Sequence, residues 1–147
     1  MISIAPYKEL FNQNLKYDLP SVFSHLNSLG HDTAKIISSY LENGLVLFEF
    51  VSPIPSVIDK KMVPYVLYSD GKYCWDGMLL HLVRDYSVEL PEEFVSHILN
   101  SEIFPSESNA LDVDKMRKKY MIQKGNLKYL LINDSQIGWN DLIESAK

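Results

Sequence analysis

The chain has 147 residues, a formal net charge of −5, and 46% apolar and 22% charged side chains, values typical of one globular domain. Its single cysteine, Cys74, excludes an intrachain disulfide and a metal site made of several cysteines. The first residues lack a secretion signal, and the longest apolar run, 45–48, is far shorter than the about 20 residues of a membrane-spanning helix. We therefore expect a cytoplasmic protein in a reducing compartment, with no membrane partner.

Three short helices are expected before residue 45. Apolar residues at helical spacing follow Pro6 and predict a first helix over 7–15. Asp18 is a suitable N-cap for a second helix, which ends at Gly30. Asp32, or the threonine after it, caps a third helix that ends at an Asn-Gly pair.

A strand and a hairpin are expected in the middle of the chain. The run 45–51 is β-branched and aromatic and predicts a strand, whereas two closely spaced prolines make 52–63 a loop. Two aromatic runs, 65–68 and 72–75, flank an Asp-Gly pair at 70–71, which is typical of a tight hairpin turn.

Two helices are expected directly after the hairpin. Asp76 caps the first, whose apolar face extends to Tyr86. The second begins at Pro91, because proline is tolerated in a first turn and the helix dipole favours the acidic Glu92 and Glu93 there. Its apolar face extends to residue 99.

The last third of the chain is predicted to contain a linker, a helix, a strand and a short final helix, over 101–109, 112–123, 127–132 and 139–145. The fold class is therefore α+β, with short N-terminal helices, a small central antiparallel sheet that includes the hairpin, and further helices. We expect a single domain over 1–147, with its core in 1–100 and a C-terminal extension, 101–147, packed on that core.

The sequence offers little evidence for catalysis, a cofactor or a metal site. The four histidines form no metal-ligand motif, and no glycine-rich nucleotide loop or nucleophilic serine motif is present. Cys74 is expected to be structural because free cysteine is usually buried, and Glu92 with Glu93 are expected to be capping charges. The basic run Lys115–Lys119 is interpreted as a solvated helix face, paired with neighbouring acids, rather than a phosphate-binding surface. We therefore predict no catalytic residue, no cofactor and no metal.

The negative charge lies in the first two thirds of the chain. Residues 1–100 hold 12 acidic and 7 basic side chains, which gives −5, whereas 101–147 hold 7 of each, which gives zero. Such a balance is unsuited to bare nucleic acid, which requires clustered Lys and Arg. It suits a basic protein partner, because complementary fields accelerate encounter. The alternative is that the charge only keeps a small domain soluble.

The stretch 65–76 combines four aromatic residues and two carboxylates around the hairpin turn. In an alternating strand Tyr73 and Trp75 share one face, and Cys74 points to the other. One face is expected to join the core, while the turn could present Tyr and Asp side chains to a partner, since aromatic residues anchor many interfaces. Simple core packing of the hairpin is the alternative.

The run Leu-Tyr-Ser-Asp-Gly-Lys-Tyr-Cys-Trp-Asp over 67–76, followed by a helix and the segment 86–94, resembles small bacterial proteins of toxin–immunity loci, including the immunity proteins of contact-dependent growth inhibition. A Gly-His pair at 30–31 and Gly44 before the strand fit the same pattern, and the resemblance covers about residues 5–100. It implies a non-catalytic protein that neutralises the C-terminal toxin domain of a large secreted protein, often a nuclease. It assigns no role to any individual residue.

Together these observations predict an immunity protein that blocks a basic toxin domain through an acidic surface. The predicted contact residues are Asp70, Tyr73, Asp76, Asp85 and Glu89. Three alternatives stay open. One is a scaffold module that recruits another protein through its C-terminal segment. Another is an enzyme whose site combines scattered residues such as Cys74, Asp76 and His81. The last is nucleic-acid binding through the basic helix face. The oligomeric state is not predicted.

Overall fold

The computed structural model describes residues 1–144 and confirms the α+β fold class. Its centre is a six-stranded mixed sheet with the strand order β2-β5-β6-β1-β7-β8. The strands are β1 Ile2–Ser3, β2 Leu45–Glu49, β5 Val66–Ser69, β6 Tyr73–Asp76, β7 Lys128–Leu130 and β8 Gln136–Gly138. A separate two-stranded sheet joins β3 Ile54–Pro55 to β4 Met62–Val63.

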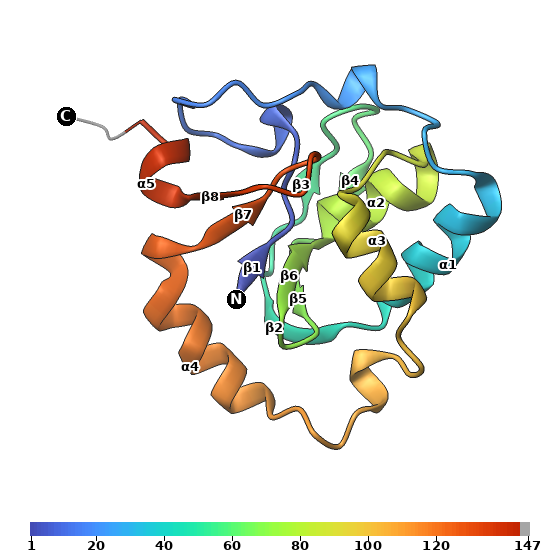
Figure 1. The fold of residues 1–147 in the computed structure, drawn as a ribbon, viewed down its shortest axis with the longest axis vertical. Coiled ribbons are helices and arrows are strands. Elements are labelled where there is room, and N and C mark those ends of the chain that lie inside the picture. The colour runs from blue at the N-terminus through green and yellow to red at the C-terminus, as the bar shows by residue number, and fades with distance from the viewer. Residues whose placement is uncertain (145–147) are drawn as a thin grey trace.

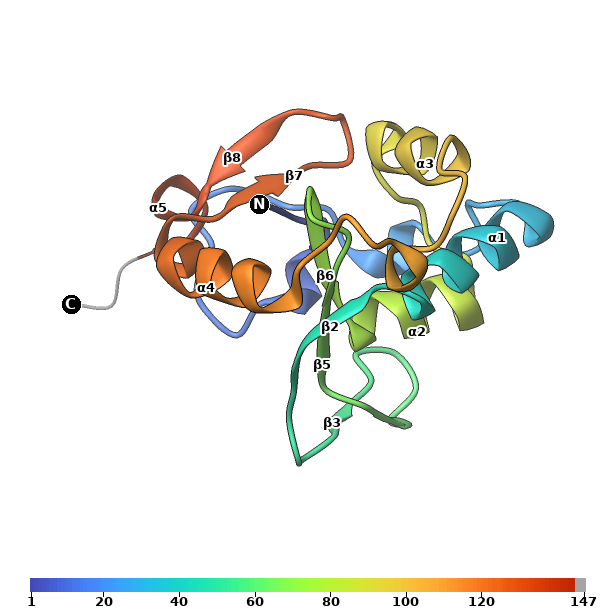
Figure 2. The same cartoon turned by 90° about the horizontal axis from the view of Figure 1, so that it is seen from below.

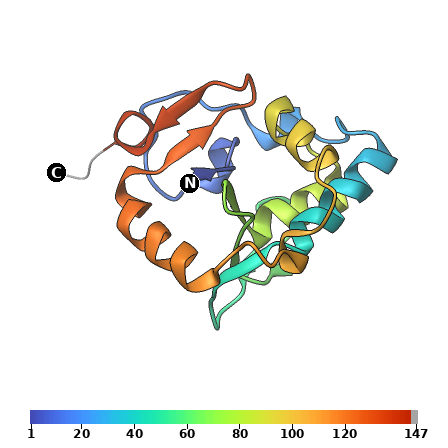
Figure 3. The same ribbon diagram turned by 60° about the horizontal axis from the view of Figure 1, so that its bottom comes forward.

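The chain's first strand joins the two halves of the sheet. β1 pairs in parallel with β6 on one side and with β7 on the other, while the remaining pairs are antiparallel. Figure 3 shows the N-terminus lying between the green hairpin and the orange C-terminal strand. The sheet is therefore larger than the small antiparallel sheet expected from the sequence, because the two parallel pairs join residues far apart in the chain.

Three helices, α1 His31–Glu42, α2 Gly77–Tyr86 and α3 Glu92–Leu99, pack together on one face of the sheet. Helix α4 Val113–Gln123 packs against β2, and the short α5 Trp139–Leu142 packs next to β8. Figures 1 and 2 show α1, α2 and α3 grouped on one side of the molecule, and α4 and α5 on the other. Among residues 1–144, no helix is long and apolar enough to cross a membrane.

Alternation along the strands divides the buried residues into two clusters. Tyr73 and Trp75 on β6 belong to the larger cluster, under α1, α2 and α3, where both rings contact Phe94. On β7, Leu130 joins the same cluster, whereas Tyr129 belongs to a second cluster on the other face. The predicted division of the hairpin strand into two faces agrees with the structure.

The predicted caps and turn of the central region are confirmed. The Asp76 side chain accepts a hydrogen bond from the Leu79 N–H at the start of α2, and Gly71 adopts φ +98° in the hairpin turn. Gly77 follows the cap because a Cβ there would lie 2.3 Å from the Pro64 carbonyl oxygen. Helices α3 and α4 also lie where the sequence predicts them. Helix α1 begins at His31 with Gly30 as its N-cap, so the predicted cap at Asp32 or the residue after it is wrong, and strand β2 ends two residues earlier than predicted.

The first two predicted helices are wrong. Residues 7–15 contain only the 3-10 turn Lys8–Leu10, and the second helix is reduced to the 3-10 turn Val22–Ser24, capped by Ser21. Here the chain wraps along the rim of both clusters: Tyr7 enters the first cluster, while Phe11 and Leu15 pack on the second. Residues that must reach two separate cores cannot share one helical stripe.

Strands β1 and β8 and the small β3–β4 hairpin were not predicted. The segment 52–63, expected to be a loop, contains β3 and β4 together with a turn between them. The predicted strand over 127–132 is shortened to β7, and the segment after it, where only a turn was expected, leads into β8. A further 3-10 turn, Pro105–Glu107, lies within the predicted linker, and Lys124–Asn126 forms another after α4. The final helix ends at Leu142, so residues 143–144 of its predicted range are not helical, and residue 145 lies outside the described residues.

Candidate functional site

Asp70, the first predicted contact residue, is a buried hydrogen-bond acceptor rather than an exposed charge. Its side chain is 3% exposed. Oδ2 accepts hydrogen bonds from the Tyr40 hydroxyl at 2.8 Å and from His97 Nε2 at 2.7 Å. Oδ1 accepts from the backbone N–H groups of Lys72 and Tyr73. The carboxylate thus joins the hairpin turn to α1 and α3. Burial of the Tyr40 hydroxyl, together with the negative charge of Asp70, raises the pKa of Tyr40 above its ordinary value.

The other predicted contact residues do not form one surface. Tyr73 is fully buried, and among the described residues its hydroxyl has no hydrogen-bond partner. Asp76 lies on the opposite face of the sheet from Tyr73, in the cap of α2. Asp85 and Glu89 have side chains 33% and 43% exposed, but each binds a histidine. The structure therefore does not bring these five residues together, and it leaves only Asp85 and Glu89 accessible to a protein partner.

A buried histidine lies between two carboxylates where α2 meets the β3–β4 segment. His81, which is 3% exposed, places Nδ1 2.9 Å from Asp85 Oδ2 and Nε2 2.8 Å from Ser56 Oγ. Asp59 Oδ2 lies 3.6 Å from Nε2 and accepts a hydrogen bond from the Tyr86 hydroxyl at 2.6 Å. Sequence reasoning missed this cluster because its members come from positions 56–59 and 81–86, with no motif joining them.

The same cluster offers three possible metal ligands, since Asp59, His81 and Asp85 place ligand atoms within 4.8 Å of one another. The two ring nitrogens of His81 point in different directions, and each is already engaged in a hydrogen bond. One ion could reach only one of them. The arrangement is explained by its structural effect: it fastens the β3–β4 segment to α2.

The pKa of Asp59 is lowered to about 2, chiefly by the Tyr86 hydrogen bond, and that of Tyr86 is raised to about 12. Because the pKa is lower in the folded state, this carboxylate stabilises the fold above about pH 4, and the contribution is lost as the pH falls towards 2. Tyr86→Phe is expected to raise the pKa of Asp59, so that the free energy of unfolding decreases less as the pH falls from about 4 towards 2. Carboxyl NMR titration measures the pKa, with Tyr17→Phe as an exposed control. An unchanged Asp59 titration in Tyr86→Phe would contradict the assignment.

An acidic, apolar groove lies between the end of α1, the end of α3 and the 3-10 turn Pro105–Glu107. Its volume is about 200 Å³. Ile36, Leu99 and Ile103 are each more than half exposed at the groove. The lining residues are Ile36, Tyr40, Ile98, Leu99, Ser101, Glu102, Ile103, Phe104 and Glu107, and thus include two glutamates and, among the described residues, no Lys or Arg.

The groove has a fixed backbone framework. The Ser106 N–H donates to the Asn43 carbonyl, which joins the 3-10 turn to the end of α1. The Ser101 hydroxyl donates to the His97 carbonyl at the end of α3. These two bonds fix the backbone beside the groove, while its aliphatic side chains are exposed. The groove, which we call the α1–α3 groove, is therefore a candidate for protein binding.

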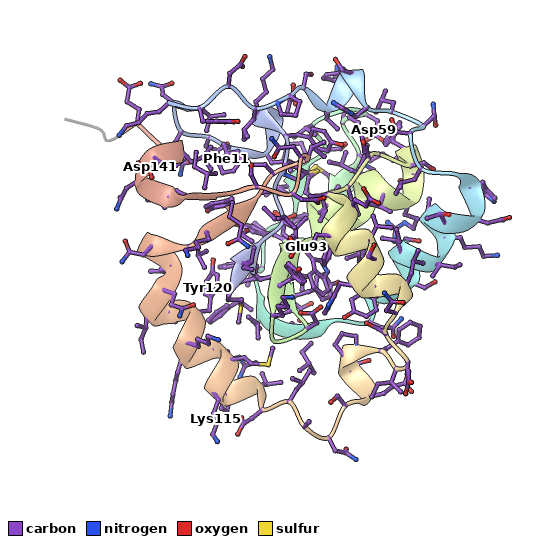
Figure 4. All side chains as sticks on the ribbon, in the orientation of Figure 1. Phe11, Asp59, Glu93, Lys115, Tyr120 and Asp141 are labelled. Carbon is purple, nitrogen blue, oxygen red and sulfur yellow. The ribbon has the colours of Figure 1, made fainter. Side chains whose placement is uncertain are left out.

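The basic run on α4 is spread along an exposed helix, as predicted. Arg117 donates to the Leu47 carbonyl at 2.7 Å and lies 3.4 Å from Asp114, three residues earlier on α4. Figure 4 labels Lys115 near the start of this helix, with its side chain directed away from the body of the molecule. The helix belongs to the side of the sheet opposite the α1–α3 groove.

Comparison with known proteins adds no relative from which a function could be inferred. No protein-family model, no curated protein and no solved structure matches the chain.

Proposed function

We propose that this chain is an immunity protein that neutralises a bacterial toxin domain by forming a tight, non-catalytic complex through the α1–α3 groove. The groove supports this proposal because it combines three exposed aliphatic side chains with two carboxylates and includes no basic residue among the described ones. An apolar centre with a polar rim is the usual composition of a specific protein interface. The acidic rim favours a basic partner.

A nuclease domain is the toxin class that best matches this surface. Such an enzyme must hold phosphates and therefore presents Lys and Arg around its active site. Glu102 and Glu107 can pair with those side chains, while Ile36, Leu99 and Ile103 can enter apolar gaps between them. Occlusion of the basic surface would then exclude the nucleic acid. The surface differs from the one predicted from the sequence, which centred on the buried Asp70.

The experiment that tests this function is co-expression with the products of the reading frames adjacent to this one, and in particular with the C-terminal domain of any large secreted protein among them. Neutralisation requires that cells expressing the toxin domain grow when this chain is present, and that the two proteins purify as a stoichiometric complex. Toxicity that persists in the presence of folded chain would refute the proposal.

Charge reversal in the groove is expected to slow association with the toxin domain. In the double variant Glu102→Lys/Glu107→Lys, we expect the association rate constant at low salt to fall by about tenfold, because rim charges act mainly on encounter. The rate constant of the unaltered chain should fall as salt increases, and that of the variant should depend less on salt. Stopped-flow or surface-based kinetics measure both.

Two controls distinguish an effect of the groove residues on binding from an effect of net charge and from an effect of changing any exposed aliphatic residue. Asp18→Lys/Asp141→Lys makes the same change in net charge at exposed positions outside the groove, and Ile122 is an exposed aliphatic residue on α4. Ile103→Ala should weaken the complex by about tenfold, as for a moderate interface contact, whereas Ile122→Ala should not. Equal effects of the groove variants and their controls would show that toxin binding occurs elsewhere.

A further inference from the structure

The proposed function does not use an aromatic cleft of about 560 Å³ on the sheet face opposite α1 and α3. It lies between the β2–β5–β6 part of the sheet, helix α4 and the N-terminal segment 10–13. Figure 4 labels two of its lining residues, Phe11 in that segment and Tyr120 on α4. The volume is within the range of about 300–1,000 Å³ that is usual for small-molecule sites.

Eight of the twenty residues that line the cleft are aromatic. Phe50 and Tyr65 lie 4.4 Å apart between ring centroids, and both are substantially exposed. Phe48 and Tyr120 form a second pair at 5.9 Å. Trp139 also lines the cleft, near the second core cluster. Rings of this kind present negative π faces, which attract cations and especially substituted ammonium groups.

A carboxylate without a cationic partner lies in the same cleft. Asp76 lines it from the end of β6, and within residues 1–144 no Lys, Arg or His forms an ion pair with it. Burial raises the pKa of the Asp76 carboxyl, opposed by the hydrogen bond from the Leu79 N–H. Burial likewise raises the pKa of the neighbouring Cys74 thiol to about 12, so that this thiol stays neutral. Lys124 is the basic residue lining the cleft, and its side chain is exposed.

Capping alone does not account for a partly buried charge at position 76. Asn or Ser would cap α2 about as well as Asp, without the cost of burying an ionised group. Asp112, which caps α4, does so at an exposed position. A carboxylate that lowers stability when ionised and faces an open, aromatic-walled cavity is typical of a binding site.

We propose that the aromatic cleft binds a small organic cation of the substituted-ammonium class, with the cationic group next to the Asp76 carboxylate and its alkyl groups against the rings of Phe50, Tyr65 and Tyr120. This site is independent of the α1–α3 groove, which lies on the other side of the sheet. A bound cation would pair with the Asp76 carboxylate, which has no cationic partner among the described side chains. It would also fill the cavity between α4 and the sheet.

Choline and its neutral isostere 3,3-dimethylbutan-1-ol test this assignment in calorimetric titrations of the full chain. Both have the same shape, so a difference between them reports the charge. We expect saturable binding of choline at least tenfold tighter than that of the isostere. Asp76→Asn should remove this preference while keeping the α2 cap, and Asp112→Asn, a cap outside the cleft, should leave it unchanged.

The same variants distinguish a ligand site from a purely structural role. Because the folded protein holds Asp76 at a raised pKa, ionisation of this group lowers stability as the pH rises above about 4. Asp76→Asn should therefore unfold at the same or a higher temperature than the unaltered chain, although it loses choline binding. Phe50→Leu, at an exposed position, should weaken choline binding at least threefold without unfolding the protein. Absence of saturable choline binding, equal affinity for the isostere, or unchanged binding in Asp76→Asn would each overturn the proposal.

Discussion

Replacing Phe94 by alanine is expected to lower the free energy of unfolding by about 3–5 kcal/mol. Phe94 is fully buried in α3 and is among the largest side chains of the first cluster. Its ring lies 5.0 Å from that of Tyr73 and 5.7 Å from that of Trp75, so it forms the aromatic contact of α3 with strand β6 in the first cluster, beside the hydrogen bond of His97 to Asp70. The substitution would leave a cavity at the point where the helix meets the sheet.

Chemical denaturation measures this loss, and Leu99→Ala is the matched control. Leu99 lies on the same helix but is 51% exposed, so its replacement should cost less than about 1 kcal/mol. Because α3 supplies one wall of the α1–α3 groove, Phe94→Ala should also reduce toxin binding at temperatures where the variant begins to unfold. A Phe94→Ala protein as stable as Leu99→Ala would contradict the assigned packing of α3.

Replacing Asp70 by alanine is expected to lower the free energy of unfolding by about 2–4 kcal/mol. The substitution removes the acceptor for Tyr40, His97 and two backbone N–H groups in a place from which water is largely excluded. The expected loss of free energy of unfolding is smaller than the sum of four charged hydrogen bonds, because His97 is 29% exposed and can bind water instead.

Asp70→Asn is the appropriate companion variant, since it keeps an acceptor oxygen for the turn while losing the charge. It should fall between the unaltered chain and Asp70→Ala in a denaturation experiment. The result also decides between two interpretations of this residue. An Asp70→Ala variant that keeps full stability but loses affinity for the toxin domain would restore Asp70 as a direct partner contact and contradict its role as a buried acceptor.

Local signals in the sequence were sufficient to predict the hairpin and the helices that follow it. Asp-Gly at the turn and Asp76 before α2 act through neighbouring backbone groups, so their effects do not depend on distant parts of the chain. The N-terminal segment differs, because strand β1 exists only through its pairing with β6 and β7. Two residues at the start of a chain carry no periodicity from which such pairing could be predicted.

The candidate sites depend even more on distant contacts. Asp70 is buried because Tyr40 and His97 reach it from helices 30 and 27 positions away. The α1–α3 groove combines residues near 36–40 with residues near 98–107. Its exposed aliphatic residues are Ile and Leu, the same residue types as in the core, so the sequence does not distinguish them from buried residues. Alternating faces along β6 did predict that Tyr73 and Cys74 point apart. Which of the two faces of β6 lies towards α4 could not be predicted, because this depends on contacts with a distant part of the chain and not on neighbouring residues.

The most direct test of the proposed function is a titration of a purified toxin domain, taken from the reading frames adjacent to this one, with the folded protein while the toxin's activity is followed. We expect complete inhibition at one equivalent, with Glu102→Lys/Glu107→Lys requiring a larger amount and Asp18→Lys/Asp141→Lys behaving as the unaltered chain. Full toxin activity in the presence of excess folded protein would contradict it.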